Sequence, residues 1–155
     1  MGATSRATID DFLAQKRIAF VGVSRQASDF SRMLWSELKR RGYDLIPVNP
    51  DAGEIDGIPC VPAVTAIQPR PDGALLMVPP QVTERVVRDC AEAGIGRVWM
   101  YRAGGDGAVS PAAIQFCVDN NISLVAGECP LMFLKGAGFH SIHGWWRKIT
   151  GTYPR

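Results

Sequence analysis

Short apolar runs alternate with amphipathic segments along most of the chain, and this alternation constrains the fold more than any other feature. The runs have strand length and are bounded by glycine, proline and asparagine. They are apolar at nearly every position, so both faces of the sheet that they form must be covered. The sequence therefore predicts an α/β fold: a Rossmann-like, doubly wound, mostly parallel sheet of about five to six strands with helices on both faces.

The individual elements follow from spacing and from residues that begin or end them. Strands are expected at 18–23, 44–48, 58–61, 74–78, 98–101 and 123–126. Apolar residues at helical spacing predict helices over 8–15, 30–41, 81–93 and 111–119, with a shorter one over 62–67. Ser28 or Asp29 can cap the second of these helices, and Gly42 can end it.

Composition excludes several classes of protein. No apolar run approaches the ~18 residues that a membrane span needs, and no apolar segment follows the N-terminus as in a signal peptide. The net charge of +2 is too small to indicate a nucleic-acid partner. The cysteines are widely separated, which favours a cytoplasmic protein over a secreted disulfide framework: Cys60, Cys90, Cys117 and Cys129. We expect neither a nucleic-acid nor a membrane partner.

The chain divides into a domain over 1–135 and a basic, aromatic C-terminal tail over 136–155. Trp145 and Trp146 lie among basic residues in this tail, which can be solvated or can dock a partner protein or a second copy in a homodimer. His140 and His143 are spaced i, i+3, but a structural metal site normally needs four ligands, so we predict no metal site.

The segment after the first strand is the main candidate for ligand binding. A buried strand ends at Gly22, a short polar loop follows, and a helix then begins. This arrangement directs backbone N–H groups and the positive end of a helix dipole toward one spot, which suits a phosphate. Ser24 replaces the second glycine of the G-x-G-x-x-G dinucleotide motif, and no G-K-[ST] follows. The Ser24 hydroxyl can donate to a phosphate oxygen, and Arg25 adds positive charge.

Other strand ends complete the candidate site, because ligands bind beyond the carboxyl ends of strands in open α/β sheets. The second strand ends at Asn49 and Pro50, where dinucleotide enzymes usually carry an acid that binds the ribose; Asp51 lies just beyond. Pro79 and Pro80 form either a rigid apolar wall for a ligand or simply a helix start. Arg102 follows the next strand.

Four of these strand ends together resemble those of the small stand-alone CoA-binding proteins: Val21-Gly22-Val23-Ser24, Val48-Asn49-Pro50, Val78-Pro79-Pro80 and Cys129-Pro130. These proteins are similar to the CoA-binding domain of the succinyl-CoA synthetase alpha subunit and of ADP-forming acyl-CoA synthetases. The resemblance covers residues 12–135 and implies a Rossmann-like domain that holds coenzyme A across its strand ends.

The resemblance also implies a role for each group of residues. The pyrophosphate loop would comprise Gly22, Val23, Ser24 and Arg25, with Asn49 and Pro50 near the nucleotide. The adenine or pantetheine would run along Val78, Pro79 and Pro80. The synthetases carry a cation shortly after the proline of their second-strand loop, where this chain has Asp51. Arg25 is the substitute that we expect to neutralise the ribose 3′-phosphate.

These observations favour binding of coenzyme A or an acyl-CoA without catalysis, and we predict no catalytic residue. The phosphorylated histidine of the synthetases lies on a second domain without a counterpart here, so we expect no ligase activity. An NAD(P)-binding oxidoreductase or redox-sensing module is one alternative, and a subunit interaction module that docks through its tail is another. Cys129 is either a reactive thiol or a small buried residue against the last strand.

Overall fold

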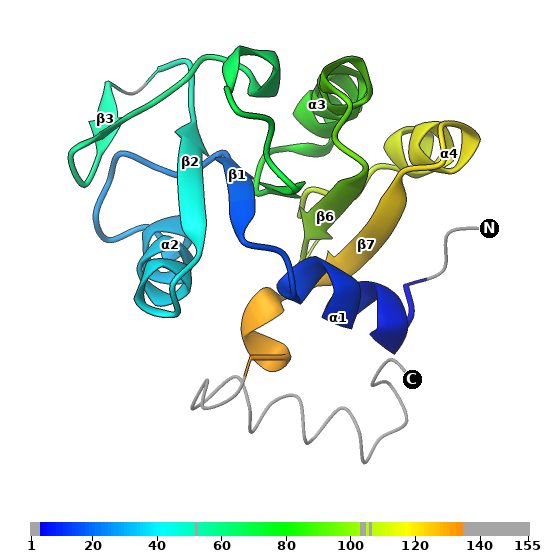
Figure 1. The fold of residues 1–155 in the computed structure, drawn as a ribbon, viewed down its shortest axis with the longest axis horizontal. Coiled ribbons are helices and arrows are strands. Elements are labelled where there is room, and N and C mark those ends of the chain that lie inside the picture. Colours follow the sequence, from blue (N-terminus) through cyan, green and yellow to red (C-terminus); the bar gives the residue numbers. More distant parts are fainter. Residues whose placement is uncertain (1–3, 52, 103–104, 106, 135–155) are drawn as a thin grey trace.

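Five parallel strands form the central sheet of the computed structural model, which describes residues 4–51, 53–102, 105 and 107–134 (Figure 1). The strand order is β2-β1-β5-β6-β7. Their bounds are Arg17–Val21 for β1, Asp44–Val48 for β2, Gly73–Leu76 for β5, Arg97–Tyr101 for β6 and Ser123–Glu128 for β7. The predicted Rossmann-like fold with a parallel sheet is confirmed.

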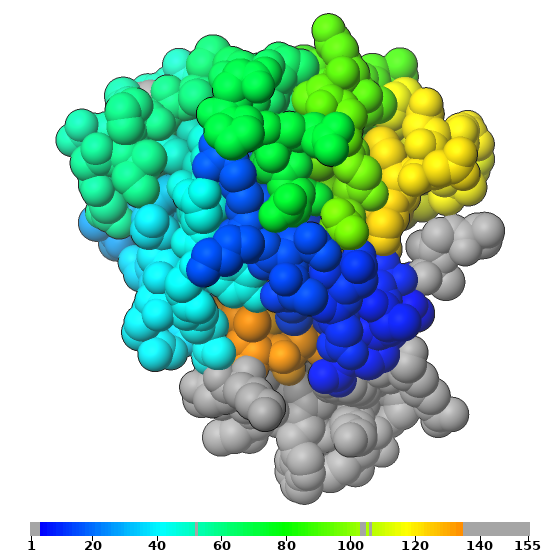
Figure 2. Space-filling model, viewed as in Figure 1, coloured from blue at the N-terminus to red at the C-terminus, as the bar shows by residue number. Residues whose placement is uncertain are grey.

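Helices cover both faces of this sheet (Figure 1). One face packs against α3 (Pro80–Ala93), α4 (Pro111–Asp119) and the 3₁₀ turn η1 (Val64–Ala66). The other packs against α1 (Arg6–Leu13), α2 (Phe30–Arg40) and the 3₁₀ turn η2 (Pro130–Met132). In Figure 2, η2 (orange) lies between the N-terminal residues (blue) and the cyan residues around α2.

Strand β1 shows why the predicted strands are apolar at every position. Ala19 and Val21 point into the core beneath α3 and α4, whereas Ile18 and Phe20 point into the core beneath α1 and α2. Successive side chains of a strand face opposite sides of the sheet, so a strand buried on both sides needs an apolar residue at each position.

The strand order has its reversal at β1. The chain passes from β1 to β2 on one side, and then returns to place β5 on the other side of β1. The connection after β1 leads to β2 and the connection after β5 leads to β6, so they run in opposite directions and open a crevice at the carboxyl ends of these strands. This topology fixes where a ligand can enter, and the sequence pattern alone did not specify it.

The segment between β2 and β5 differs from the prediction. The expected strand over 58–61 is instead a small antiparallel hairpin, β3 (Glu54–Ile55) and β4 (Ile58–Pro59), after which Val61 bridges to Val48. Asp56 and Gly57 form its turn, both with positive φ (49° and 80°). An Asp-Gly pair suits such a turn and was the signal that could have identified the hairpin. The helix expected over 62–67 shortens to η1.

The boundaries of the remaining elements follow local hydrogen bonds. Asp29 caps α2, because its side chain accepts from the Ser31 N–H at 2.8 Å. Ser110 caps α4 in the same way, through the Ala113 N–H. None of the helices described has the length and apolar character needed to cross a membrane. The predicted tail over 136–155, with its tryptophans and histidines, lies outside the described residues and stays a prediction.

Candidate functional site

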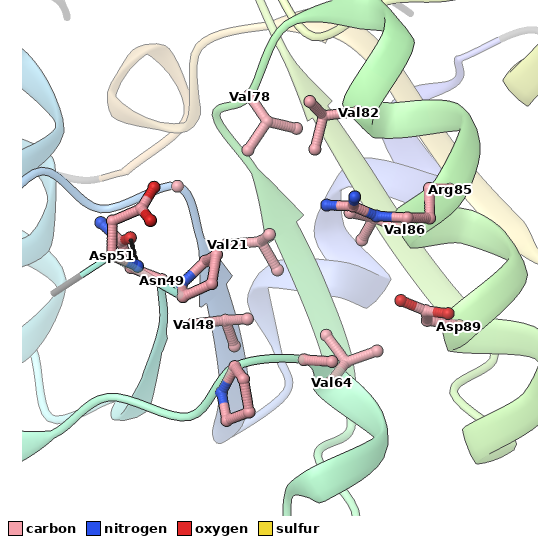
Figure 3. Close-up of a pocket in the computed structure, with 14 residues that line it drawn as sticks. Val21, Val48, Asn49, Asp51, Val64, Val78, Val82, Arg85, Val86 and Asp89 are labelled. Carbon is pink, nitrogen blue, oxygen red and sulfur yellow. Dashed lines mark hydrogen bonds between the residues drawn. The ribbon is translucent and has the colours of Figure 1, made fainter. Parts of the chain in front are cut away.

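A cavity of about 550 Å³ opens at the carboxyl ends of β1 and β2, beside α3 (Figure 3). Its size is within the range of small-molecule sites. It lies at the reversal of strand order, where ligands bind in open α/β sheets. The lining residues are Val21, Gly22, Val48, Asn49, Pro50, Asp51, Pro62, Ala63, Val64, Val78, Val82, Arg85, Val86 and Asp89.

Gly22 lets the end of β1 lie against the end of β5. Its φ is +93°, a conformation that residues with a side chain rarely adopt. A Cβ at this position would lie only 2.4 Å from the Met77 carbonyl oxygen and 2.7 Å from Cγ1 of Val78. The glycine is therefore required by the packing of two strand ends, in addition to any ligand that approaches its backbone.

Asn49 ties the loop after β2 to the loop after β1. Its side-chain amide donates to the Val23 carbonyl at 2.9 Å, and its Oδ1 accepts from the Asp51 N–H at 2.8 Å. A carboxylate at this position could accept the second bond but could not donate the first. The arrangement explains why an asparagine, rather than the ribose-binding acid of dinucleotide enzymes, follows β2.

The polar loop after β1 is held by two serine hydroxyls, its own Ser24 and Ser31 of α2. The Ser24 N–H donates to Oγ of Ser31 at 2.9 Å, and Oγ of Ser24 accepts from the Gln26 N–H at 3.0 Å. Because the Ser24 hydroxyl acts here as an acceptor, its proton remains available for a ligand oxygen.

The start of α2 leaves fewer free N–H donors than the sequence suggested. The Ser31 N–H donates to the Asp29 carboxylate, and the Arg32 N–H donates to the Asp29 carbonyl. A negative side chain thus already occupies the positive end of this helix. The donors that remain for an anion are therefore those of the loop itself, and not the first turn of the helix.

The cavity brings together only part of the predicted site. Gly22, Asn49, Pro50 and Val78 line it. Val23 instead points into the core beneath α2, and Ser24 and Arg25 lie outside the lining. Arg25 is exposed, and its guanidinium reaches the Asp51 carbonyl at 3.5 Å. The direct roles of Val23, Ser24 and Arg25 in ligand binding stay predictions.

Pro79 and Pro80 form the start of a helix. Pro79 occupies the N-cap position of α3 and Pro80 its first turn, where a missing N–H costs no hydrogen bond. Neither residue is part of the cavity lining. Arg102 follows β6, which β5 separates from β1, and its Nη2 is 2.8 Å from where a Cβ of Gly127 would be. The proposed contacts of these three residues with a ligand also stay predictions.

One face of α3 forms a wall of the cavity that the sequence analysis did not assign to the site. Val82, Arg85, Val86 and Asp89 are spaced i, i+3, i+4 and i+7, which places them on a single stripe. Figure 3 shows Arg85 and Asp89 directed from α3 toward the cavity. The charged residues Arg85 and Asp89 beside the two valines were the signal for a wall open to solvent.

The buried thiols carry pKa values raised by burial. The pKa of Cys129 rises to about 11 and that of Cys90 to about 12, in both cases mainly because burial disfavours the thiolate. A nucleophilic cysteine needs the opposite shift. Cys129 packs in the core beneath α1 and α2, as expected of a small buried residue. Within the described ranges, no group of three or more potential ligands could hold a metal ion.

Comparison with known proteins gives two kinds of relative. The chain is similar to an ADP-forming acetate–CoA ligase of Archaeoglobus fulgidus, with 31% identity over 55% of this chain and 13% of that protein. An ADP-forming acetate–CoA ligase of Methanocaldococcus jannaschii is 28% identical over 57% of this chain and also 13% of that protein. The chain therefore spans about one eighth of the length of these curated relatives.

The second kind of relative consists of small proteins that this chain covers almost completely. A solved structure of a hypothetical protein from Pyrococcus horikoshii OT3 superposes with a TM-score of 0.75 and 26% identity, over 83% of this chain and 88% of that one. A conserved hypothetical protein from Pyrococcus furiosus has a TM-score of 0.67 and 28% identity, over 74% and 95% of the two chains. The sequence profile of the CoA binding domain matches residues 16–135, and the chain belongs to this family of CoA-binding domains.

Proposed function

We propose that this domain binds coenzyme A or an acyl-CoA in the cavity beside α3 and holds the ligand without transforming it. The observation that carries the proposal is the position of this cavity. In a chain of the CoA-binding domain family, it lies at the reversal of strand order and borders the loop after β1. Open α/β sheets bind their ligands at this place.

The chemistry of the lining suits the parts of coenzyme A. Val48 and Val64 on one side face Val82 and Val86 on the other, and apolar walls of this kind accept a planar base or a pantetheine arm (Figure 3). Arg85 can pair with a phosphate. These features support a ligand that combines an apolar body with anionic groups.

The loop after β1 can supply further donors for the phosphates. The Ser24 hydroxyl accepts from the Gln26 N–H and keeps its own proton for a ligand. Two carboxylates, Asp51 and Asp89, also border the cavity and would repel a phosphate. We therefore place the phosphates near the loop and Arg85, and expect the carboxylates to accept from ribose hydroxyls or from the adenine amino group.

Binding without reaction is supported by the side chains that line the cavity. They are mostly valine, proline and alanine, which carry no acid, base or nucleophile. The ligase reactions of the curated relatives belong to proteins of which this chain matches 13%, so they are not attributed to it.

The free thiols of the four cysteines support a cytoplasmic setting.

Asn49 favours coenzyme A over NAD. Its side chain donates to Val23 and accepts from Asp51, and it provides no carboxylate for the two ribose hydroxyls of a dinucleotide. An NAD-linked oxidoreductase would need Asp51, two residues further along the chain, to bind both ribose hydroxyls.

Calorimetric titration of the purified protein with CoA, acetyl-CoA, NAD and NADP tests the proposal. We expect binding of CoA or acetyl-CoA and little heat from the dinucleotides. Clear binding of NADP with none of CoA or acetyl-CoA would overturn it. Incubation with acetyl-CoA followed by mass spectrometry tests whether the bound ligand reacts. We expect intact acetyl-CoA, and protein-dependent release of free CoA would contradict binding without reaction.

A further inference from the structure

The guanidinium of Arg32 joins two segments that the sheet topology does not connect directly. Its Nη1 donates to the carbonyl oxygens of Ser24 at 3.3 Å and of Arg25 at 3.2 Å, in the loop after β1. Its Nη2 donates to Oδ1 of Asp56 at 2.7 Å, in the turn of the β3–β4 hairpin. Only 14% of the Arg32 side chain is exposed, whereas 52% of the Asp56 side chain is, so the guanidinium itself is more shielded from water than its carboxylate partner.

The position of Asp56 is itself fixed from two sides. Its second carboxylate oxygen accepts from Nε1 of Trp35 at 3.1 Å, and Trp35 is fully buried. Its backbone has a φ of 49° in the tight turn with Gly57. A carboxylate held by a buried indole and a two-residue turn gives the guanidinium a defined partner, and a paired guanidinium is confined to few orientations.

The bonds from Arg32 orient the peptide groups of the loop. In a trans peptide, the C=O and N–H groups point in opposite directions. The Ser24 and Arg25 carbonyls face Arg32, so the N–H groups of the same peptides, those of Arg25 and Gln26, face the other way. The Gln26 N–H donates to Oγ of Ser24, and the Arg25 N–H has no hydrogen-bond partner among the described residues.

We propose that Arg32 is a positioning residue for anion binding by the loop after β1. It holds two carbonyl oxygens on the α2 side, away from an incoming phosphate, and leaves the Arg25 N–H and the Ser24 hydroxyl on the other side as donors. Asp56 of the hairpin fixes the guanidinium in this position. The inference rests on the proposed binding of coenzyme A, and it adds a preorganised loop whose shape depends on residues outside the cavity.

The chain provides a matched control in Arg17. Its guanidinium also binds one carboxylate, Oδ2 of Asp44 at 2.7 Å, and two backbone carbonyls, those of Pro69 at 2.9 Å and Gln68 at 3.4 Å. It lies at the amino end of β1, the opposite edge of the sheet from the cavity. Arg17→Ala therefore removes the same kind of contacts without touching the loop.

The experiment compares Arg32→Ala, Arg17→Ala and the wild type by thermal unfolding and by titration with CoA and 3′-dephospho-CoA. We expect Arg32→Ala to weaken binding of both ligands by about tenfold, because both carry the pyrophosphate. Arg17→Ala should lower the unfolding temperature similarly but bind both ligands as the wild type does. Equal affinities in folded Arg32→Ala and wild type would overturn the inference, whereas absent binding by the wild type would overturn the proposed function instead.

Two further measurements test the role of Arg32 separately, one on a variant of its partner Asp56 and one on the Gln26 amide. Asp56→Asn changes an exposed turn and removes the negative charge and one of the two acceptor oxygens that hold the guanidinium and the Trp35 indole. It covers the case in which Arg32→Ala does not fold, and we expect it to weaken binding of both ligands several-fold. Hydrogen exchange of the Gln26 amide in the ligand-free protein should be faster in Asp56→Asn and Arg32→Ala than in Arg17→Ala. Exchange unchanged from the wild type would contradict a role for Arg32 in shaping the loop.

Discussion

The side-chain amide of Asn49 donates to the carbonyl of Val23 at 2.9 Å and so joins the loops that follow the first two strands. Both loops border the cavity, the first through Gly22 and the second through Asn49 to Asp51. The distance between the two loops is thus fixed by a donor that an ionised carboxylate cannot replace.

Asn49→Asp tests this link. A carboxylate facing the Val23 carbonyl repels it, and we expect the variant to lose about 1–3 kcal/mol of stability at neutral pH, the cost of losing a half-buried hydrogen bond. Repulsion favours the neutral acid and raises its pKa in the folded state. The stability deficit relative to wild type should therefore shrink as the pH falls through that raised pKa. Urea unfolding at pH 7 and pH 4 measures this, and Asn49→Asp as stable as wild type at pH 7 would contradict it.

Gly22→Ala tests the packing of the β1 and β5 ends. The added Cβ meets the Met77 carbonyl at 2.4 Å in a backbone conformation that alanine disfavours. We expect a loss of about 1–3 kcal/mol in the free energy of unfolding. Gly53→Ala is the control, because no φ in the left-handed region and no atom within 4 Å is found at Gly53. Equal unfolding free energies of the two variants would show that Gly22 is not under this constraint.

Arg85→Ala tests the cation of the cavity wall. If Arg85 pairs with the 3′-phosphate, its loss should weaken CoA binding by about tenfold and leave 3′-dephospho-CoA binding nearly unchanged. Arg88 lies on the same helix, with its guanidinium 5.3 Å from the centre of the Phe116 ring, and is no part of the cavity lining. Arg88→Ala should bind both ligands normally. A parallel loss for both ligands in Arg85→Ala would argue for the pyrophosphate as the partner of Arg85.

The buried thiols predict how stability depends on alkaline pH. Burial raises the pKa of Cys117 and Cys129 to about 11 and of Cys90 to about 12, from an ordinary value of 9.0. Unfolding exposes thiols that ionise more readily, so the stabilisation is complete below pH 9 and is lost as the pH rises toward the folded pKa values. Denaturation at pH 8 and pH 10 should show this fall, and a smaller one in Cys129→Ala. An identical fall in wild type and variant would exclude a contribution from Cys129.

Thiol labelling checks the same burial directly. Cys60 is half-buried, whereas the other three cysteines are buried. We expect Ellman's reagent at pH 8 to modify Cys60 first in the folded protein. Cys60→Ser should abolish this fast phase, and fast labelling of Cys129 in that variant would contradict its place in the core.

Local rules of sequence sufficed for the main elements of this domain. Continuous apolar runs such as that of β1 identify strands buried on both faces, and capping residues such as Asp29 and Ser110 identify helix starts. Gly22 and Asn49 were also predicted from the sequence as parts of a ligand site, and both line the cavity. Each of these signals depends on residues close together in the chain, and for this reason a single sequence displays them.

The tertiary structure decided which of these residues meet. Arg85 and Asp89 reach the cavity only because α3 packs beside the ends of β1 and β2, and Arg102 lies apart because β6 is on the far side of β5. Arg32 contacts the hairpin residue Asp56 across 24 positions of sequence. Contacts of this kind follow from strand order and helix packing, which depend on burial of the whole core rather than on any local pattern.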